Sequence, residues 1–193
     1  MIKTANFSRR VLVAMYLGIA VLVLVVAALV FVAMRPEDFH VERSAQVSAP
    51  PDVVFPMINN FHQWARWSPY EKFDPDMKKT FEGPESGPGA VYAWDGNSKA
   101  GAGRTTILES KPGELVSIKL EMFKPFAGTN QVAFKLVPTE GGTRVSWGMD
   151  GKYNFITKGL CLFMDMDAMI GKEFAEGLAN LDAAVQAHAP KGN

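Results

Sequence analysis

The sequence FMDMDAMIGKEFAEGLANLDAAV, residues 163–185, decides the fold, because it predicts a long helix with one apolar face. At 100° per residue its large apolar side chains fall within one narrow stripe, which indicates the face that packs against the rest of the protein. The stripe consists of Phe163, Ile170, Phe174, Leu178, Leu181 and Val185. We expect helical structure from Asn154, a suitable N-terminal cap, to about His188, with Pro190 beyond its end.

Upstream of this helix, apolar and polar residues alternate over short segments separated by turn residues, which is typical of an antiparallel sheet. These segments are HVERSAQVSA (40–49), MKKTFEG (77–83), AVYAWDG (90–96), GRTTILES (103–110), ELVSIKLEM (114–122), NQVAFKLVP (130–138) and TRVSWGMDG (143–151). After the first segment, two small helices are predicted, in APPDVVFPMIN (49–59) and around Phe61 and Trp64.

This order of elements predicts an α+β helix-grip fold, in which a curved antiparallel sheet of about six to seven strands wraps around the C-terminal helix. Such a sheet leaves space beside the helix, and strand alternation indicates which side chains face that space. The inward set is rich in aromatic residues and methionine, which suit adaptable apolar binding surfaces. The candidate ligand cavity consists of Trp67, Tyr92, Trp94, Ile107, Ile118, Leu120, Phe134, Trp147, Met149, Phe163, Met166, Asp167, Ile170 and Phe174. A filled core is the alternative interpretation of the same pattern.

Two aspartates, Asp165 and Asp167, stand among the apolar residues at the start of the predicted C-terminal helix. Asp165 faces away from the apolar stripe, and a solvated or first-turn acid is expected there. Asp167 lies within the stripe. Residues two apart on a helix do not face each other, so the two carboxylates do not form an acid–base pair, and nothing at helical spacing completes a metal site. Asp167 is expected either to pair with Arg43 of the first strand or to contact a ligand or transfer a proton.

Other signatures of catalysis or of nucleic-acid binding are missing. The sequence has no G-x-S-x-G, no phosphate-binding glycine loop and no metal-ligand spacing, so no catalytic residue, metal or cofactor is expected. All 20 acidic residues follow Met34, with 17 of the 20 basic ones, so this part carries a net charge of −3 and nucleic acid is not expected as a partner. The single cysteine, Cys161, cannot form an internal disulfide.

The stretch VLVAMYLGIAVLVLVVAALVFVAM, residues 11–34, has no charged residue and predicts a transmembrane helix. As a helix it extends about 36 Å, more than the roughly 30 Å hydrocarbon core of a bilayer. A cleaved signal peptide is the alternative, although its apolar region is normally about 7–15 residues long. Because Lys3, Arg9 and Arg10 precede the span, we expect residues 1–10 in the cytoplasm and the domain of residues 35–193 outside, in the periplasm of a bacterium.

Several stretches of the sequence resemble bacterial proteins of the SRPBCC superfamily, which includes START-related and polyketide cyclase/dehydrase domains. They are SAPPDVVFPMINNFHQWARWSPYEKFDP (48–75), GPGAVYAWDGNSKAGAGR (87–104), GGTRVSWGMDG (141–151) and LFMDMDAMIGKEFAEGLANL (162–181). The resemblance extends from about Val41 to Val185. It implies the helix-grip fold, a deep apolar cavity and binding of lipids or other hydrophobic small molecules. The superfamily includes enzymes and carriers, and it has no common set of catalytic residues to transfer.

Together these observations predict a single-pass membrane protein that binds a lipid or other hydrophobic small molecule between the sheet and the C-terminal helix. A binding protein is favoured over an enzyme. One alternative is cyclase or dehydratase chemistry on a polyketide-like substrate, for which Asp167, Tyr92 and Arg43 are the available proton-transfer groups. The other alternative is a protein-interaction domain, and the sequence names no protein partner.

Overall fold

The computed structural model describes residues 2–187, which form two compact units. The first unit combines the chain up to Glu37 with Tyr153–Phe163, and the second combines Asp38–Lys152 with the chain from Met164 onward. Met1 and the predicted tail residues His188 and Pro190 lie outside the described residues.

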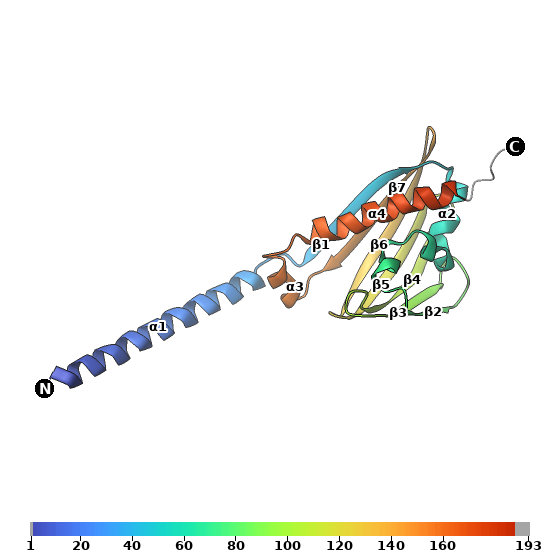
Figure 1. Ribbon diagram of the computed structural model, residues 1–193. Coiled ribbons are helices and arrows are strands. Elements are labelled where there is room, and N and C mark those ends of the chain that lie inside the picture. Colours follow the sequence, from blue (N-terminus) through green and yellow to red (C-terminus); the bar gives the residue numbers. More distant parts are fainter. Residues whose placement is uncertain (1, 188–193) are drawn as a thin grey trace. The chain divides into compact units, whose positions relative to one another are not determined.

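The first unit contains α1 (Ile2–Ala33) and α3 (Phe155–Leu160), both marked in Figure 1. Within residues 2–187, α1 includes the one helix stretch, Val11–Ala33, that is long and apolar enough to cross a membrane. From Val11 to Ala33, every side chain except that of Val32 is exposed. The side chain of Asn154 caps α3 by accepting a hydrogen bond from the Thr157 backbone amide, 2.8 Å away.

The second unit contains a seven-stranded antiparallel sheet with the strand order β1-β7-β6-β5-β4-β3-β2. The strands are β1 (Asp38–Val47), β2 (Lys78–Glu82), β3 (Val91–Asp95), β4 (Ala102–Lys111), β5 (Leu115–Lys124), β6 (Gly128–Thr139) and β7 (Gly142–Lys152). Each corresponds to one of the strands predicted from alternation and turn residues. The predicted α+β helix-grip fold is therefore confirmed.

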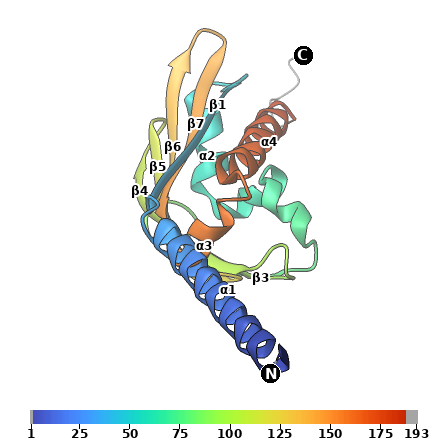
Figure 2. The ribbon, with the colours of Figure 1, turned by 90° about the vertical axis from the view of Figure 1, so that its left-hand side faces the viewer.

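Helices of the second unit pack on one side of this sheet, as Figure 2 shows for α2 (Pro51–Asn59) and α4 (Met166–Gln186). Two short 3-10 helices, η1 (Phe61–Arg66) and η2 (Pro69–Phe73), follow α2. On α4, the residues of the predicted stripe from the middle of the helix onward are buried, namely Phe174, Leu178, Leu181 and Val185. Because this stripe packs against the core, the predicted buried face of the helix is confirmed for these positions.

The helical segment predicted from Asn154 is interrupted, because the chain leaves helical structure after α3 and enters it again only at Met166. The physical reason is a new cap: the Asp165 carboxylate accepts a hydrogen bond from the Ala168 backbone amide, 3.0 Å away, and begins α4 there. Phe163 therefore precedes α4, and 88% of its surface is exposed. Its predicted place on the packing stripe of the helix is therefore wrong.

The core of the second unit is dominated by packed aromatic rings. The ring of Trp147 stacks on Phe174 of α4 with centroids 4.3 Å apart, and it contacts Phe134 with centroids 4.8 Å apart. Trp67 completes the cluster, 5.9 Å from Phe134. These rings are almost fully buried, so aromatic side chains occupy the inner face of the sheet beneath α4.

Candidate functional site

Most residues of the predicted cavity lie in the interior between the sheet and the helices that cover it. Those that are buried are Trp67, Tyr92, Ile107, Ile118, Phe134, Trp147, Met149 and Phe174. Trp94, Leu120 and Ile170 are partly buried and pack against the same core. Met166 is half-buried at the start of α4, whereas Asp167 is exposed. The structure thus brings eleven of the fourteen positions into one core, while Asp167 and Phe163 are exposed.

The indole N–H groups divide the chain's four tryptophans into two kinds. Three of them donate to backbone carbonyls: Trp64 to Ile58 at 2.9 Å, Trp67 to Met57 at 2.9 Å, and Trp94 to Ala100 at 3.1 Å. The fourth, Trp147, is 3% exposed, and its Nε1 has no hydrogen-bond partner among the described residues. Trp147 therefore presents an unsatisfied donor inside an otherwise apolar interior.

Asp167 is held by Arg43 rather than directed into the interior. Nη2 of Arg43 lies 2.8 Å from Oδ2 of Asp167, and Nη1 lies 3.3 Å from Oδ1. The hydrogen bond to the Arg43 guanidinium lowers the pKa of the Asp167 carboxyl below its usual value, although partial desolvation opposes the shift. The predicted ion pair is confirmed, and an ionised carboxylate is poorly suited to act as a general acid at neutral pH.

Tyr92, on β3 near the opposite edge of the sheet, belongs to a separate polar group. Its hydroxyl donates to Oε1 of Glu71, 3.1 Å away, and the other carboxylate oxygen of Glu71 forms an ion pair with Lys79. Burial, and then the charge of Glu71, raise the pKa of the Tyr92 hydroxyl. Tyr92 therefore stays protonated and donates to a carboxylate that is already neutralised.

The candidate proton-transfer groups do not meet at one point. Arg43, which binds Asp167 of α4, lies on β1. Tyr92 lies on β3, with β7, β6, β5 and β4 between the two strands. At ~4.8 Å for each strand spacing, the separation is roughly 24 Å along the sheet. Each group also has its own local partner. The arrangement disfavours an acid–base pair made of Asp167 and Tyr92.

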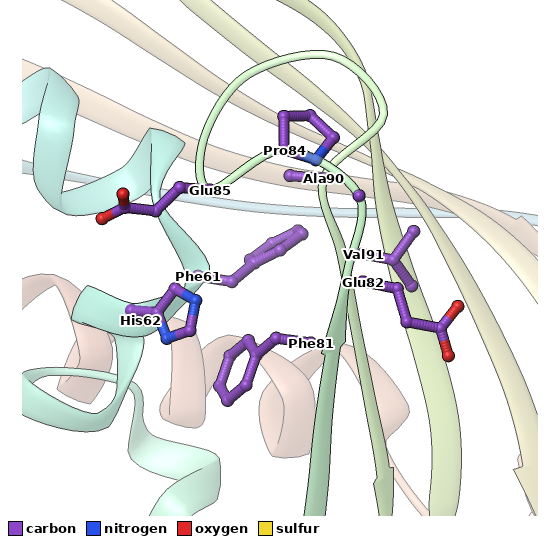
Figure 3. A pocket seen from close by; sticks show the side chains of 9 residues that line it. Phe61, His62, Phe81, Glu82, Pro84, Glu85, Ala90 and Val91 are labelled. Atoms are coloured by element: carbon purple, nitrogen blue, oxygen red, sulfur yellow. The ribbon is translucent and has the colours of Figure 1, made fainter.

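A pocket that sequence reasoning missed lies at the β2 edge of the sheet (Figure 3). Its volume is about 280 Å³, close to the lower limit of ~300 Å³ typical of ligand sites. Its lining combines aromatic and acidic groups: Phe61, His62, Phe81, Glu82, Gly83, Pro84, Glu85, Ala90 and Val91. The rings of His62 and Phe81 stack with centroids 4.0 Å apart. No sequence signal identifies this pocket, because it forms only where η1 meets the loop after β2.

The fold and the aromatic interior define a helix-grip protein. A comparison with known protein families identifies the family. Residues 38–186 match the family described as "Polyketide cyclase / dehydrase and lipid transport". This match covers most of the chain, so the protein belongs to that family. The predicted resemblance is confirmed at the level of the family. No curated protein matches the sequence.

Solved structures share the fold at low sequence identity. A protein from Chromobacterium violaceum aligns with a TM-score of 0.54 at 17% identity, over 76% of this chain and 96% of that one. The Aha1 dimer from Colwellia psychrerythraea aligns with a TM-score of 0.55 at 14% identity, over 79% and 99% of the respective chains. The di-domain ARO/CYC protein StfQ of the steffimycin biosynthetic pathway aligns with 0.57 at 14% identity, over 79% and 52%. At these identities the likeness shows the fold alone.

Proposed function

We propose that the protein is a membrane-anchored binder of a lipid or another hydrophobic small molecule, which it holds between the sheet and α4. Family membership supports the chemical class of the ligand, since the family is described by polyketide cyclisation and lipid transport. Both activities handle extended apolar molecules that carry a few carbonyl or hydroxyl groups. An aromatic interior with one free donor suits such molecules.

The unpaired indole of Trp147 is the observation that carries this proposal. A buried donor without an acceptor costs ~1–3 kcal/mol, so a folded protein normally satisfies it. The other three tryptophans do so through backbone carbonyls. A carbonyl or hydroxyl oxygen of a bound ligand would accept the hydrogen bond of Trp147, while Trp67, Phe134 and Phe174 contact its apolar part.

Membrane anchoring by α1 is the second part of the proposal. Val11–Ala33 is 23 residues long, which corresponds to about 34 Å of helix and exceeds the ~30 Å of a hydrocarbon core. Nearly all of its side chains are exposed among the described residues. A bilayer would supply an apolar environment for them. A cleaved signal sequence is the competing interpretation, and the intact mass of the purified protein distinguishes the two.

The test of ligand binding uses the full-length protein in nanodiscs and compares two matched substitutions. Trp147→Phe removes the unpaired N–H and keeps an aromatic ring, whereas Trp64→Phe removes an N–H that is already paired within the protein. Binding of a fluorescent fatty acid probe that carries a free carboxyl group is measured by titration. We expect Trp147→Phe to weaken binding about 5- to 30-fold, which corresponds to the loss of ~1–2 kcal/mol.

Trp64→Phe should lower the thermal midpoint of unfolding without a comparable loss of affinity. Mass spectrometry of organic extracts from the same preparations identifies any ligand that co-purifies. A wild-type protein that carries no extractable molecule and never binds the probe would contradict the proposal. Equal losses of affinity in Trp147→Phe and Trp64→Phe would show that the unpaired N–H of Trp147 does not bind the ligand.

A further inference from the structure

We propose that the segment Phe155–Phe163 lies in the membrane surface, with its apolar side chains inserted at the boundary between lipid headgroups and acyl chains. This inference rests on the proposed anchoring by α1 and adds a second membrane contact to it. The segment is the part of the first unit that contains α3 and the turn after it.

The polarity of this segment is inverted relative to a helix on a water-soluble protein. Five large apolar side chains are exposed: Phe155 at 50%, Ile156 at 58%, Leu160 at 39%, Leu162 at 39% and Phe163 at 88%. The one charged residue of the segment, Lys158, is instead 5% exposed. A helix in water buries its apolar face and exposes its charges, so this arrangement indicates an apolar exterior.

Lys158 ties α3 to the end of the proposed membrane span. Its Nζ donates to the backbone carbonyl of Ala33, 3.4 Å away, and to Oε1 of Glu37, 3.1 Å away. The Tyr153 backbone amide donates to the Glu37 carbonyl at 2.7 Å. Because Ala33 is the last residue of the apolar helix, these contacts hold the segment at the level where the span leaves the hydrocarbon.

The backbone of the segment is also suited to an environment with little water. The amides of Lys158, Cys161, Leu162 and Phe163 all donate to carbonyls of residues three or four positions earlier. The amide of Thr157 is satisfied by the Asn154 side chain. Unpaired amides are costly in lipid, so this pairing lowers the cost of insertion. Short interfacial elements of this kind insert their apolar side chains by about 5–10 Å.

A lipid surface explains the exposed side chains better than a protein partner does. The segment is hydrogen-bonded to the end of the apolar helix stretch Val11–Ala33, so the same bilayer accounts for the exposed apolar side chains of both. No further contact has to be assumed. A protein partner would have to bind Ile156 and Phe163 next to the membrane surface. The measurement below gives different results for a lipid contact and a protein contact.

The experiment measures the depth of spin labels in the full-length protein reconstituted into vesicles of phosphatidylcholine and phosphatidylglycerol. Cys161 is the chain's only cysteine, so it is labelled directly, and Ile156→Cys and Phe163→Cys are labelled in a Cys161→Ser background. Collision rates with oxygen, which concentrates in lipid, are compared with those of a water-soluble nickel chelate. We expect each of the three positions to favour oxygen at least threefold over the exposed control Lys135→Cys of β6.

Val25→Cys in α1 is the control for the anchor, and it separates failure of this inference from failure of the anchoring on which it rests. If Val25→Cys favours oxygen but positions 156, 161 and 163 behave like Lys135→Cys, the segment lies in water and the inference is overturned while the anchor stands. If Val25→Cys also behaves like Lys135→Cys, α1 is not in the membrane and both fail. Exclusion of both collision partners at 156 and 163 would indicate a protein contact and would overturn the inference as well.

Discussion

The guanidinium of Arg43 on β1 is hydrogen-bonded to both carboxylate oxygens of Asp167 and, at 3.1 Å, to its backbone carbonyl. Since β1 is an edge strand and Asp167 lies in the first turn of α4, the pair joins one edge of the sheet to the beginning of the helix that covers the core. Gly171, one turn later, leaves the required space, because a Cβ atom there would overlap the guanidinium.

The first prediction concerns the proton affinity of Asp167. Its carboxyl pKa lies below the usual 3.8 because Arg43 donates to the ionised form. In Arg43→Ala we expect the pKa of Asp167 to rise toward the usual value. Carboxyl ¹³C NMR titration of both proteins measures the change. A pKa of Asp167 that lies above 3.8 in the wild-type protein would contradict the assignment and reopen a role as a general acid.

The same pair predicts how stability depends on pH. A carboxyl group with a lowered pKa in the folded state stabilises that state above its unfolded pKa, and the contribution disappears as the pH falls through the folded pKa. The thermal midpoint of Asp167→Asn should therefore lie slightly below that of the wild type at pH 6 and converge with it below the usual value of 3.8. A constant difference between the two proteins across this range would show that the ion pair does not cause it.

A second prediction uses the close approach of α4 to the aromatic core at Gly177. A Cβ atom there would lie 2.6 Å from Cζ3 of Trp147 and 2.9 Å from Cδ of Pro69, and both neighbours are rigid rings. Gly177→Ala should lower the free energy of unfolding by ~1–3 kcal/mol, although alanine is the better helix former. Gly128→Ala is the control, because nothing lies within 4 Å of its Cβ position. Urea denaturation of the full chain in detergent measures both changes.

The regular elements could be predicted from sequence because each has a local signal. Alternation on β7 places Val145, Trp147 and Met149 on one face, and all three are buried. The 3.6-residue period likewise identifies Phe174 and Leu181 as the buried face of α4. These patterns record which side of an element meets the core, so they determine the fold class and most of the interior residues.

Features that depend on single caps or on distant segments could not be predicted in this way. The carboxylate of Asp165 caps the start of α4, so Phe163 precedes the helix and does not lie on its packed face. The sequence alone does not decide whether Asp167 pairs with Arg43 or contacts a ligand, because a helical period does not define tertiary contacts. The missing acceptor of Trp147 depends on all its neighbours together, and no sequence pattern reports it.

A third prediction concerns the buried lysine of the first unit. The side chain of Lys158 is 6% exposed, whereas that of its partner Glu37 is 59% exposed. Lys158→Met keeps the apolar stem and removes the hydrogen bonds to Glu37 and Ala33, so α3 should loosen against the end of α1. After discounting for the exposure of Glu37, we expect a loss of ~1–2 kcal/mol in local stability.

The effect of Lys158→Met is measured as the mobility of a spin label on Cys161, three residues along the chain. The spectrum should sharpen in Lys158→Met. It should remain unchanged in Lys152→Met, because Lys152 forms an exposed pair with Asp38 whose side chains are 70% and 82% exposed. Equal spectra for wild type and Lys158→Met would show that the lysine does not hold α3 in place.

The last prediction concerns topology, which decides which ligands the domain can reach. Lys3, Arg9 and Arg10 precede the apolar span, and clusters of basic residues resist translocation, so we expect the N-terminus in the cytoplasm and residues 35–193 outside. In bacterial spheroplasts, a membrane-impermeant maleimide should label Lys135→Cys in a Cys161→Ser background before any permeabilisation. Labelling that appears only after detergent would place the domain in the cytoplasm. An intact mass that lacks the residues of α1 would instead identify a cleaved signal sequence. In that case no helix would remain to hold the domain beside the bilayer.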